Sequence, residues 1–144
     1  MRVYLDVCSF NRPFDDQSQL RIRLEAEAKL RIQEEIRARE IEMVWSYILD
    51  YENDKNPYPE RKNWISAWRG YAALDVIESP ELLLSASSLH KEGLPKIDSL
   101  HLACAIAAMC EYFITTDDRI LRCKLRVAEI NIVDPIVFIK ERGL

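Results

Sequence analysis

The sequence predicts an α/β fold, in which a mainly parallel sheet of four or five strands carries helices on both faces. Short apolar segments with strand character alternate along the chain with longer segments of helical composition, and this alternation is typical of α/β domains. The chain has 144 residues, of which 49% are hydrophobic, and this is enough for one domain with one core. We therefore expect a single domain that spans residues 1–144.

The N-terminal part begins with a predicted buried strand, Val3–Leu5, which ends at Asp6. Asn, Pro and Asp residues between positions 11 and 16 indicate a loop. Residues 19–40 contain no Gly or Pro and are rich in Ala, Leu, Glu and Arg, which predicts a long helix. Apolar residues alternate there as in a strand, but strands rarely run so far. On a helix they form two faces, one suited to cover the sheet and the other to contact a partner chain.

A second strand is predicted at residues 42–45, and Ser46 is a good N-cap for the helix that follows. That helix carries Asp50 and Glu52 and stops before the prolines at positions 57 and 59. Residues 60–74 are predicted as one helix, with three aromatic side chains on one side. Aromatic residues can stack on bases, but at helical spacing we favour a core role for Trp64, Trp68 and Tyr71.

The C-terminal half continues the alternation of strands and helices. Residues 97–112 are apolar nearly all round, which predicts a core helix. The other elements expected here are a strand at 75–77, a helix capped by Ser79, a strand at 112–115, a short basic helix at 119–126, a strand at 130–133 and a C-terminal helix.

The composition excludes several classes of protein. No apolar run approaches the ~20 residues that a bilayer span requires, and the N-terminus lacks the features of a signal peptide, so we expect a cytoplasmic protein without a membrane role. The net charge of −4 argues against nucleic-acid binding through a broad basic surface. The four cysteines form no zinc-binding spacing; we expect buried free thiols at Cys8, Cys104, Cys110 and Cys123.

Acidic residues follow or flank several of the predicted strands. In an open parallel sheet the ligand site lies beyond the C-terminal strand ends, so these acids are expected at one edge. A single Asp in such a place is more often a turn or cap residue, and the argument depends on the whole set. The acids concerned are Asp6, Glu52, Asp98, Asp117 and Asp118.

A cluster of carboxylates is unfavourable unless a cation compensates the charge. Ligands that are all oxygen atoms suit Mg²⁺ or Mn²⁺ rather than zinc. Such an ion can activate water, polarise a phosphoryl oxygen and stabilise the leaving oxygen, which are the requirements of phosphodiester hydrolysis. The acids therefore indicate a metal-dependent nuclease.

The same segments resemble the PIN-domain family, and in particular VapC-like toxin ribonucleases. The resemblance covers essentially the whole chain in the right order. It is carried by the segments Val3–Asp6, Ser46–Glu52, Asp98–Ala105, Phe113–Asp118 and Val133–Pro135. It implies a metal-dependent endoribonuclease in which Asp6, Glu52, Asp98 and Asp117 are the catalytic and metal-binding residues.

The resemblance leaves two choices of ligand open. Asp50 lies close to Glu52, and Asp118 is adjacent to Asp117, so either neighbour could take the place assigned to the other; we include Asp118 among the metal ligands. Thr115 and Ser9 are implied to orient ligands or water. From their positions near the predicted site loops, Arg12 and Arg119 could contact the RNA backbone, although a solvated helix face explains Arg119, Arg122, Lys124 and Arg126 equally well. His101 could support the metal site, but a core histidine is favoured.

The resemblance also implies partners. Many relatives are toxins silenced by a small antitoxin protein, and homodimers are common. The main alternative is a catalytically inactive PIN-like module that binds RNA or protein. A phosphatase with an Asp nucleophile would need a second Asp where Cys8 stands, and a receiver domain needs a late lysine that we do not find.

Overall fold

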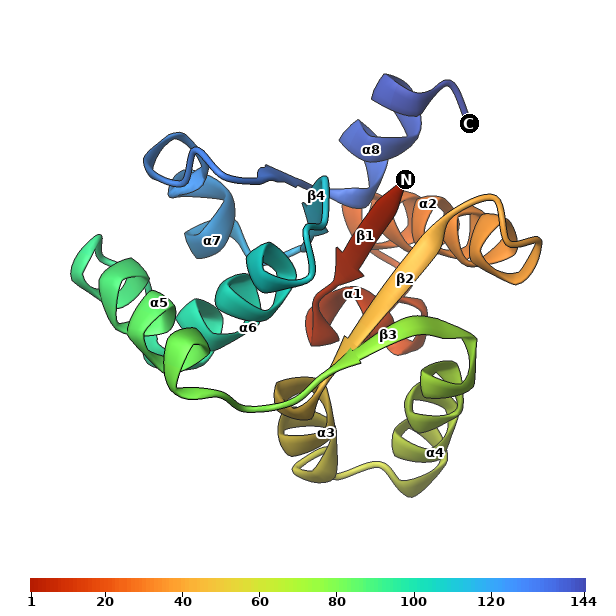
Figure 1. Ribbon diagram of the computed structural model, residues 1–144. Helices are drawn as coiled ribbons and strands as arrows, with labels where there is room; N and C mark the ends of the chain where they lie inside the picture. Colours follow the sequence, from red (N-terminus) through yellow and green to blue (C-terminus); the bar gives the residue numbers. More distant parts are fainter.

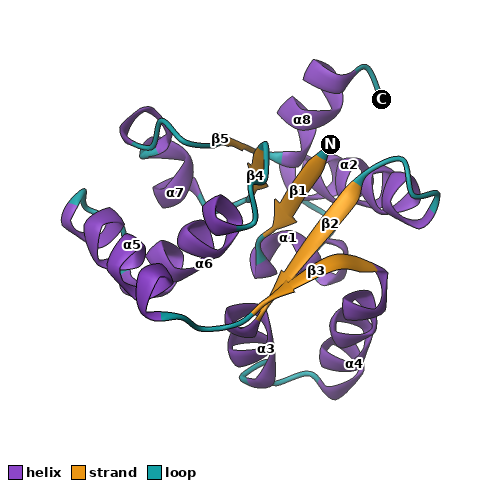
Figure 2. Ribbon diagram, in the orientation of Figure 1, coloured by secondary structure: helices purple, strands orange, loops and turns teal.

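Five strands form the central sheet of the protein in a computed structural model that describes residues 1–144. They are β1 (Arg2–Leu5), β2 (Glu42–Ser46), β3 (Ala72–Val76), β4 (Tyr112–Ile114) and β5 (Asn131–Val133). Every pairing is parallel, in the order β3-β2-β1-β4-β5 (Figure 2). This sheet confirms the predicted α/β class and its parallel strands.

The central strand β1 lies at the point where the order of the sheet reverses. Two strands that follow it in the chain lie on one side, and the other two lie on its opposite side. Val3, Tyr4 and Leu5 are completely buried, as expected for a parallel strand covered on both faces. Polar groups that follow β1 and its neighbour β4 therefore meet at the reversal point, where open α/β sheets bind their ligands.

Helices cover both faces of the sheet (Figure 1). The helices α5, α6 and α7 lie on one side, and α2 and α8 pack together on the other. None of the helices is both long and apolar enough to cross a bilayer. The α-helices are α1 (Val7–Asn11), α2 (Leu20–Arg37), α3 (Tyr47–Asp54), α4 (Pro59–Ala67), α5 (Pro80–Lys91), α6 (Lys96–Ala107), α7 (Asp118–Arg122) and α8 (Pro135–Arg142). Three short 3₁₀ helices are η1 (Arg12–Phe14), η2 (Trp68–Tyr71) and η3 (Lys124–Arg126).

Caps at the helix ends follow the residues that the sequence places there. Ser46 Oγ accepts a hydrogen bond from Leu49 N at 3.2 Å, and Ser79 Oγ accepts one from Leu82 N at 3.1 Å. Both serines satisfy an N–H group that has no partner inside the helix. The predicted caps at Ser46 and Ser79 are thus confirmed.

The long helix α2 confirms the prediction for residues 19–40 but not the division of its faces. Its buried face is the stripe Glu25, Ala26, Lys29, Ile32, Gln33 and Ile36. Three of these are polar or charged, whereas the apolar Leu20, Leu24 and Leu30 are exposed. The helix thus buries hydrophilic groups that a simple alternation of apolar residues cannot identify.

Three predicted segments were wrong in detail. The segment predicted as a loop at residues 11–16 contains the last residue of α1 and the 3₁₀ helix η1. Asp6 caps α1 by accepting a hydrogen bond from Val7 N. The helix predicted for residues 60–74 ends at Ala67, and residues from Ala72 onward pair with β2 as a strand. The core helix stops at Ala107, since Met109 adopts a left-handed φ of 56°. Long-range strand pairing, which no local pattern shows, decides the second case.

Candidate active site

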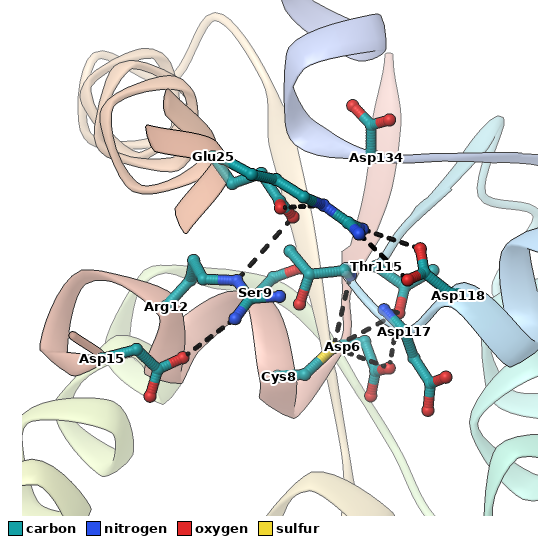
Figure 3. A network of polar contacts seen from close by, with 12 residues as sticks. Asp6, Cys8, Ser9, Arg12, Asp15, Glu25, Thr115, Asp117, Asp118 and Asp134 are labelled. Carbon is teal, nitrogen blue, oxygen red and sulfur yellow. Dashed lines mark hydrogen bonds and ion pairs between the residues drawn. The ribbon is translucent and has the colours of Figure 1, made fainter. Parts of the chain in front are cut away.

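Asp6 occupies the reversal point of the sheet and is held from two directions. Its Oδ1 accepts a hydrogen bond from Val7 N at 2.7 Å, and its Oδ2 accepts one from Thr115 Oγ1 at 2.9 Å. The pairing of Leu5 with Ile114 brings the ends of β1 and β4 side by side. Only 4% of Asp6 is exposed. The carboxylate is therefore a fixed, largely desolvated acid (Figure 3).

Glu52 reaches the same place from helix α3. Ser46 ends β2 and caps α3, and Glu52 lies in the next turns of that helix. Its Oε1 is hydrogen-bonded to Nε2 of His101, which projects from α6. The same Nε2 lies 3.8 Å from Asp6 Oδ1. Asp6, Glu52 and His101 each offer a ligand atom, and these atoms lie within 4.8 Å of one another.

A buried hydrogen-bond chain holds His101. Its Nδ1 lies 2.6 Å from the Tyr4 hydroxyl, which lies 2.6 Å from Ser46 Oγ. Tyr4, His101 and Ser46 are all completely buried. If the Tyr4 hydroxyl donates to Nδ1, the imidazole carries its hydrogen on Nε2 and donates it to Glu52. The chain thus fixes the ring and, through it, the Glu52 carboxylate.

Asp98 and Asp117 are the two further predicted acids, and they lie near Asp6 but outside the compact group of Asp6, Glu52 and His101. Asp98 lies in the first turn of α6, and its buried Oδ2 has no hydrogen-bond partner. Burial, followed by the charges of Asp6 and Asp117, raises the pKa of Asp98 to about 6. Asp117 caps α7 by accepting a hydrogen bond from Arg119 N at 2.9 Å, and its own N–H donates to Thr115 Oγ1 at 3.1 Å. Thr115 thus links Asp117 to Asp6.

The donor set fits a divalent cation. Four carboxylates from four segments are oxygen ligands of the type that Mg²⁺ and Mn²⁺ prefer. The unpartnered Oδ2 of Asp98 is a buried acceptor of the kind that normally finds a partner. A cation would supply that partner and would offset the repulsion that raises the Asp98 pKa.

Two neighbouring acids lie outside the cluster. Asp118 forms two hydrogen bonds with the Arg21 guanidinium, at 2.9 and 2.7 Å, and more than half of its side chain is exposed. The structure therefore does not bring Asp118 together with the other predicted ligands, because α2 supplies it with a cation. Asp50 accepts a hydrogen bond from Trp45 Nε1 at 2.9 Å. As metal ligands, the geometry therefore favours Glu52 over Asp50 and Asp117 over Asp118.

The remaining predicted site residues have different surroundings. Ser9 is completely buried and donates to the Ile114 carbonyl at 3.1 Å, so it holds α1 against β4 rather than facing the acids. Arg12 lies between Asp15 at 3.3 Å and Glu25 at 3.7 Å (Figure 3). Arg119 is exposed and pairs with Asp117 at 3.3 Å. The basic side chains Arg122, Lys124 and Arg126 are also exposed.

Two neighbours of the acids were not assigned to the site from the sequence. His101 is completely buried, as the sequence predicts, but it also contacts Glu52. It lies three positions after Asp98 on α6, a spacing that places two side chains on one helix face. Cys8 was expected to be a buried thiol. Its Sγ lies 3.3 Å from Asp6 Oδ2 and 3.2 Å from Thr115 Oγ1. All four cysteines are free, and only Cys8 is partly exposed.

A polar groove leads away from the cluster. It has a volume of about 440 Å³ and reaches both Glu52 and Asp117. Its far wall carries cationic and amide side chains together with Tyr58, which is 57% exposed. The basic side chains that line it are Arg12, Lys55 and Arg61.

Two solved structures share this architecture. FitAcB from Neisseria gonorrhoeae aligns with a TM-score of 0.57 and 15% identity, over 92% of this chain and 97% of that one. VapBC2 from Rickettsia felis, bound to a DNA fragment from their promoter, aligns with a TM-score of 0.57 and 12% identity over the same shares. The chain has a PIN-like fold. At these identities the likeness establishes the PIN-like fold alone. No family model and no curated protein matches the sequence.

Proposed function

We propose that this protein is a metal-dependent endoribonuclease that hydrolyses RNA phosphodiester bonds. The observation that carries the proposal is the meeting of Asp6, which follows β1, and Glu52 of α3 with His101 of α6. Burial raises the pKa of Asp98 of α6, which is close enough for their charges to raise it further, and its buried Oδ2 has no hydrogen-bond partner. Such a cluster has no evident structural role, because mutual repulsion destabilises it without a cation. Its place beyond the C-terminal ends of parallel strands is also where α/β sheets bind substrates.

Asp6, Glu52, Asp98 and Asp117 would hold one or two Mg²⁺ or Mn²⁺ ions. When bound, such an ion supplies an activated water and stabilises charge on the phosphoryl and leaving oxygens. Thr115 and Val7 N fix the Asp6 carboxylate, and His101 orients Glu52.

The groove supports a single-stranded RNA substrate. Arg12, Lys55 and Arg61 can contact backbone phosphates, which position a strand without reading its sequence. Tyr58 is exposed beside them and offers a ring on which a base can stack. The net charge of the protein is −4, so RNA binding requires a local group of cations, and the three basic side chains provide it. The exposed Arg119 would add a contact next to Asp117.

We further propose that the protein is the toxin of a toxin–antitoxin pair and forms a homodimer. The sequence resemblance to VapC-like nucleases implies an antitoxin partner and a second copy of the chain. The structural neighbour VapBC2 is named as a VapBC protein, which supports the toxin–antitoxin interpretation. An antitoxin segment that inserts a basic side chain among the four acids would compensate their charge in place of a metal ion.

Cleavage of a structured RNA with single-stranded loops tests the function. Wild type should cut with Mg²⁺ or Mn²⁺ and stop in EDTA, and Asp6→Asn and Asp98→Asn should each lose more than about 100-fold in rate, since even outer partners of a metal site are worth 10- to 100-fold. Asp118→Asn is the matched control, because it removes an adjacent acid that is paired with Arg21, and it should cut normally. Full activity in EDTA, or in either cluster variant, contradicts the proposal, whereas RNA binding without cleavage would identify the inactive binding module.

A further inference from the structure

A second cavity lies on the other side of η1, between helices α2 and α4. It has a volume of about 280 Å³ and is mostly apolar. Its walls include Phe10, Phe14, Trp64 and Trp68. Trp64 is 57% exposed and Phe14 is 40% exposed, so the aromatic surface is open to an incoming molecule.

Lys29 lines this cavity and has no anionic partner. Only 3% of the residue is exposed, and its Nζ faces aromatic rings rather than a carboxylate. Its Nζ lies 4.9 Å from the ring centroid of Phe10 and 5.8 Å from that of Trp68. These ring contacts recover only part of the cost of desolvating a charge. Burial, with a smaller contribution from Arg37, accordingly lowers the pKa of Lys29 to about 7.

The nearest acid on the same helix face is already engaged. Glu25 lies one turn before Lys29, at the spacing that normally forms an ion pair. Its carboxylate instead contacts Arg21 at 2.8 Å and Arg12 at 3.7 Å. The Lys29 ammonium is therefore left without an anion although a buried carboxylate is close along the helix.

Gln33, one turn after Lys29, adds a second unpaired donor. It also lines the cavity, it is 4% exposed, and its Nε2 has no hydrogen-bond partner. Buried donors normally have partners, and those without one call for an explanation such as a missing ligand. Two consecutive turns of α2 thus present N–H groups, and no carboxylate, to an aromatic cavity.

We propose that this cavity binds a small apolar carboxylic acid, with its carboxylate on Lys29 Nζ and its hydrocarbon body between the aromatic walls. The charge is complementary to the unpaired ammonium, and the apolar lining suits a ring or a branched chain. The volume lies just below the range of about 300 to 1,000 Å³ found for pockets of drug-sized ligands, so it fits a compact molecule. This site is separate from the acidic cluster and does not depend on the nuclease proposal.

Binding of naphthalene-2-carboxylate, compared with its uncharged analogue naphthalene-2-carboxamide, tests the inference. Titrations followed by tryptophan fluorescence and by calorimetry should give at least a tenfold preference of the wild type for the carboxylate. Lys29→Met should lose that preference while still binding the apolar body. Lys91→Met, which removes an exposed lysine of α5 on the other side of the sheet, should behave as the wild type.

The wild-type comparison alone can refute the proposal, so it remains testable even if a variant fails to fold. Equal affinity for the two probes, or no binding of the carboxylate at millimolar concentration, overturns the inference. A preference that survives in Lys29→Met overturns it as well, because the carboxylate would then lie elsewhere.

Discussion

The acidic cluster with its polar groove and the Lys29 cavity lie on opposite sides of the same short segment, and they bury charges of opposite sign. Arg12 at the start of η1 lines the groove, and Phe14 at its end lines the cavity. In the cluster, Asp6, Glu52 and Asp98 form no ion pair with a lysine or arginine, whereas the cavity holds an ammonium group without an anion. A charge that is buried but uncompensated reduces stability, so both regions are explained best as places where a bound partner completes the charge balance.

The two regions differ in how their charges are held. Hydrogen bonds from Thr115, Val7 N and His101 fix the Asp6 and Glu52 carboxylates of the cluster, as a preorganised site requires. The Lys29 ammonium instead lies near the rings of Phe10 and Trp68, with no hydrogen bond that fixes its position. The cluster therefore has a fixed geometry, and the cavity suits an apolar ligand with a single charged contact.

The largest expected effect concerns Lys29 and the pH dependence of stability. Because the folded protein lowers the Lys29 pKa from 10.5 to about 7, the unfolded chain binds more protons between these values, and stability rises with pH through this window. Relative to a variant without Lys29, in which the buried cysteines and tyrosines still titrate, the wild type should gain roughly 4 kcal/mol in the free energy of unfolding, at about 1.4 kcal/mol per pKa unit. Urea denaturation from pH 6.5 to 10.5 measures it.

The control for this experiment is Lys29→Met, which removes the titrating group and keeps a long apolar side chain. Its stability should lack this rise and should exceed that of the wild type at pH 7. A parallel rise in both proteins would show that Lys29 is paired or solvated, and the contrast between the two regions would disappear.

A smaller effect is expected from substitution of His101, which positions the Glu52 carboxylate in the acidic cluster. His101→Phe removes the donor to Glu52, and the affinity for Mn²⁺ should fall about 10- to 100-fold, as for other outer partners of metal ligands. His101→Gln can still donate a hydrogen bond and should recover part of the loss. Calorimetric titration with Mn²⁺ measures the change directly. Wild-type affinity in His101→Phe would show that Glu52 needs no such support.

The smallest effect concerns the repulsion inside the cluster. Asp98→Asn removes one charge whose pKa is raised by burial and by Asp6 and Asp117, so the metal-free variant should be more stable than the wild type at pH 7 by about 1 to 2 kcal/mol. Thermal unfolding in EDTA and in Mn²⁺ measures both states. The metal should raise the melting temperature of the wild type only. A less stable metal-free variant would mean that Asp98 has a structural role, and it would contradict the view that repulsion among the carboxylates destabilises the metal-free cluster.

The order of strands and helices could be predicted from the sequence because it rests on local patterns. Apolar segments such as Val3–Leu5 form buried strands, and Ser46 and Ser79 cap the next helices through contacts within three residues. Parallel topology then places the residues that follow β1 and β4 at one edge. The meeting of Asp6 with Thr115 is a consequence of these rules.

Contacts between distant segments decided the rest. The sequence by itself determined the fold class and pointed to Asp6, Glu52, Asp98 and Asp117 as candidate ligands, because side-chain periodicity and residue type are local properties. Only the tertiary structure showed that Asp118 pairs with Arg21 instead of facing the other acids, and that His101 is hydrogen-bonded to Tyr4 and Glu52. It also showed that Lys29 is buried without an anion. Each of these depends on which residue of another element lies within hydrogen-bond reach, and that distance is fixed only when the elements pack.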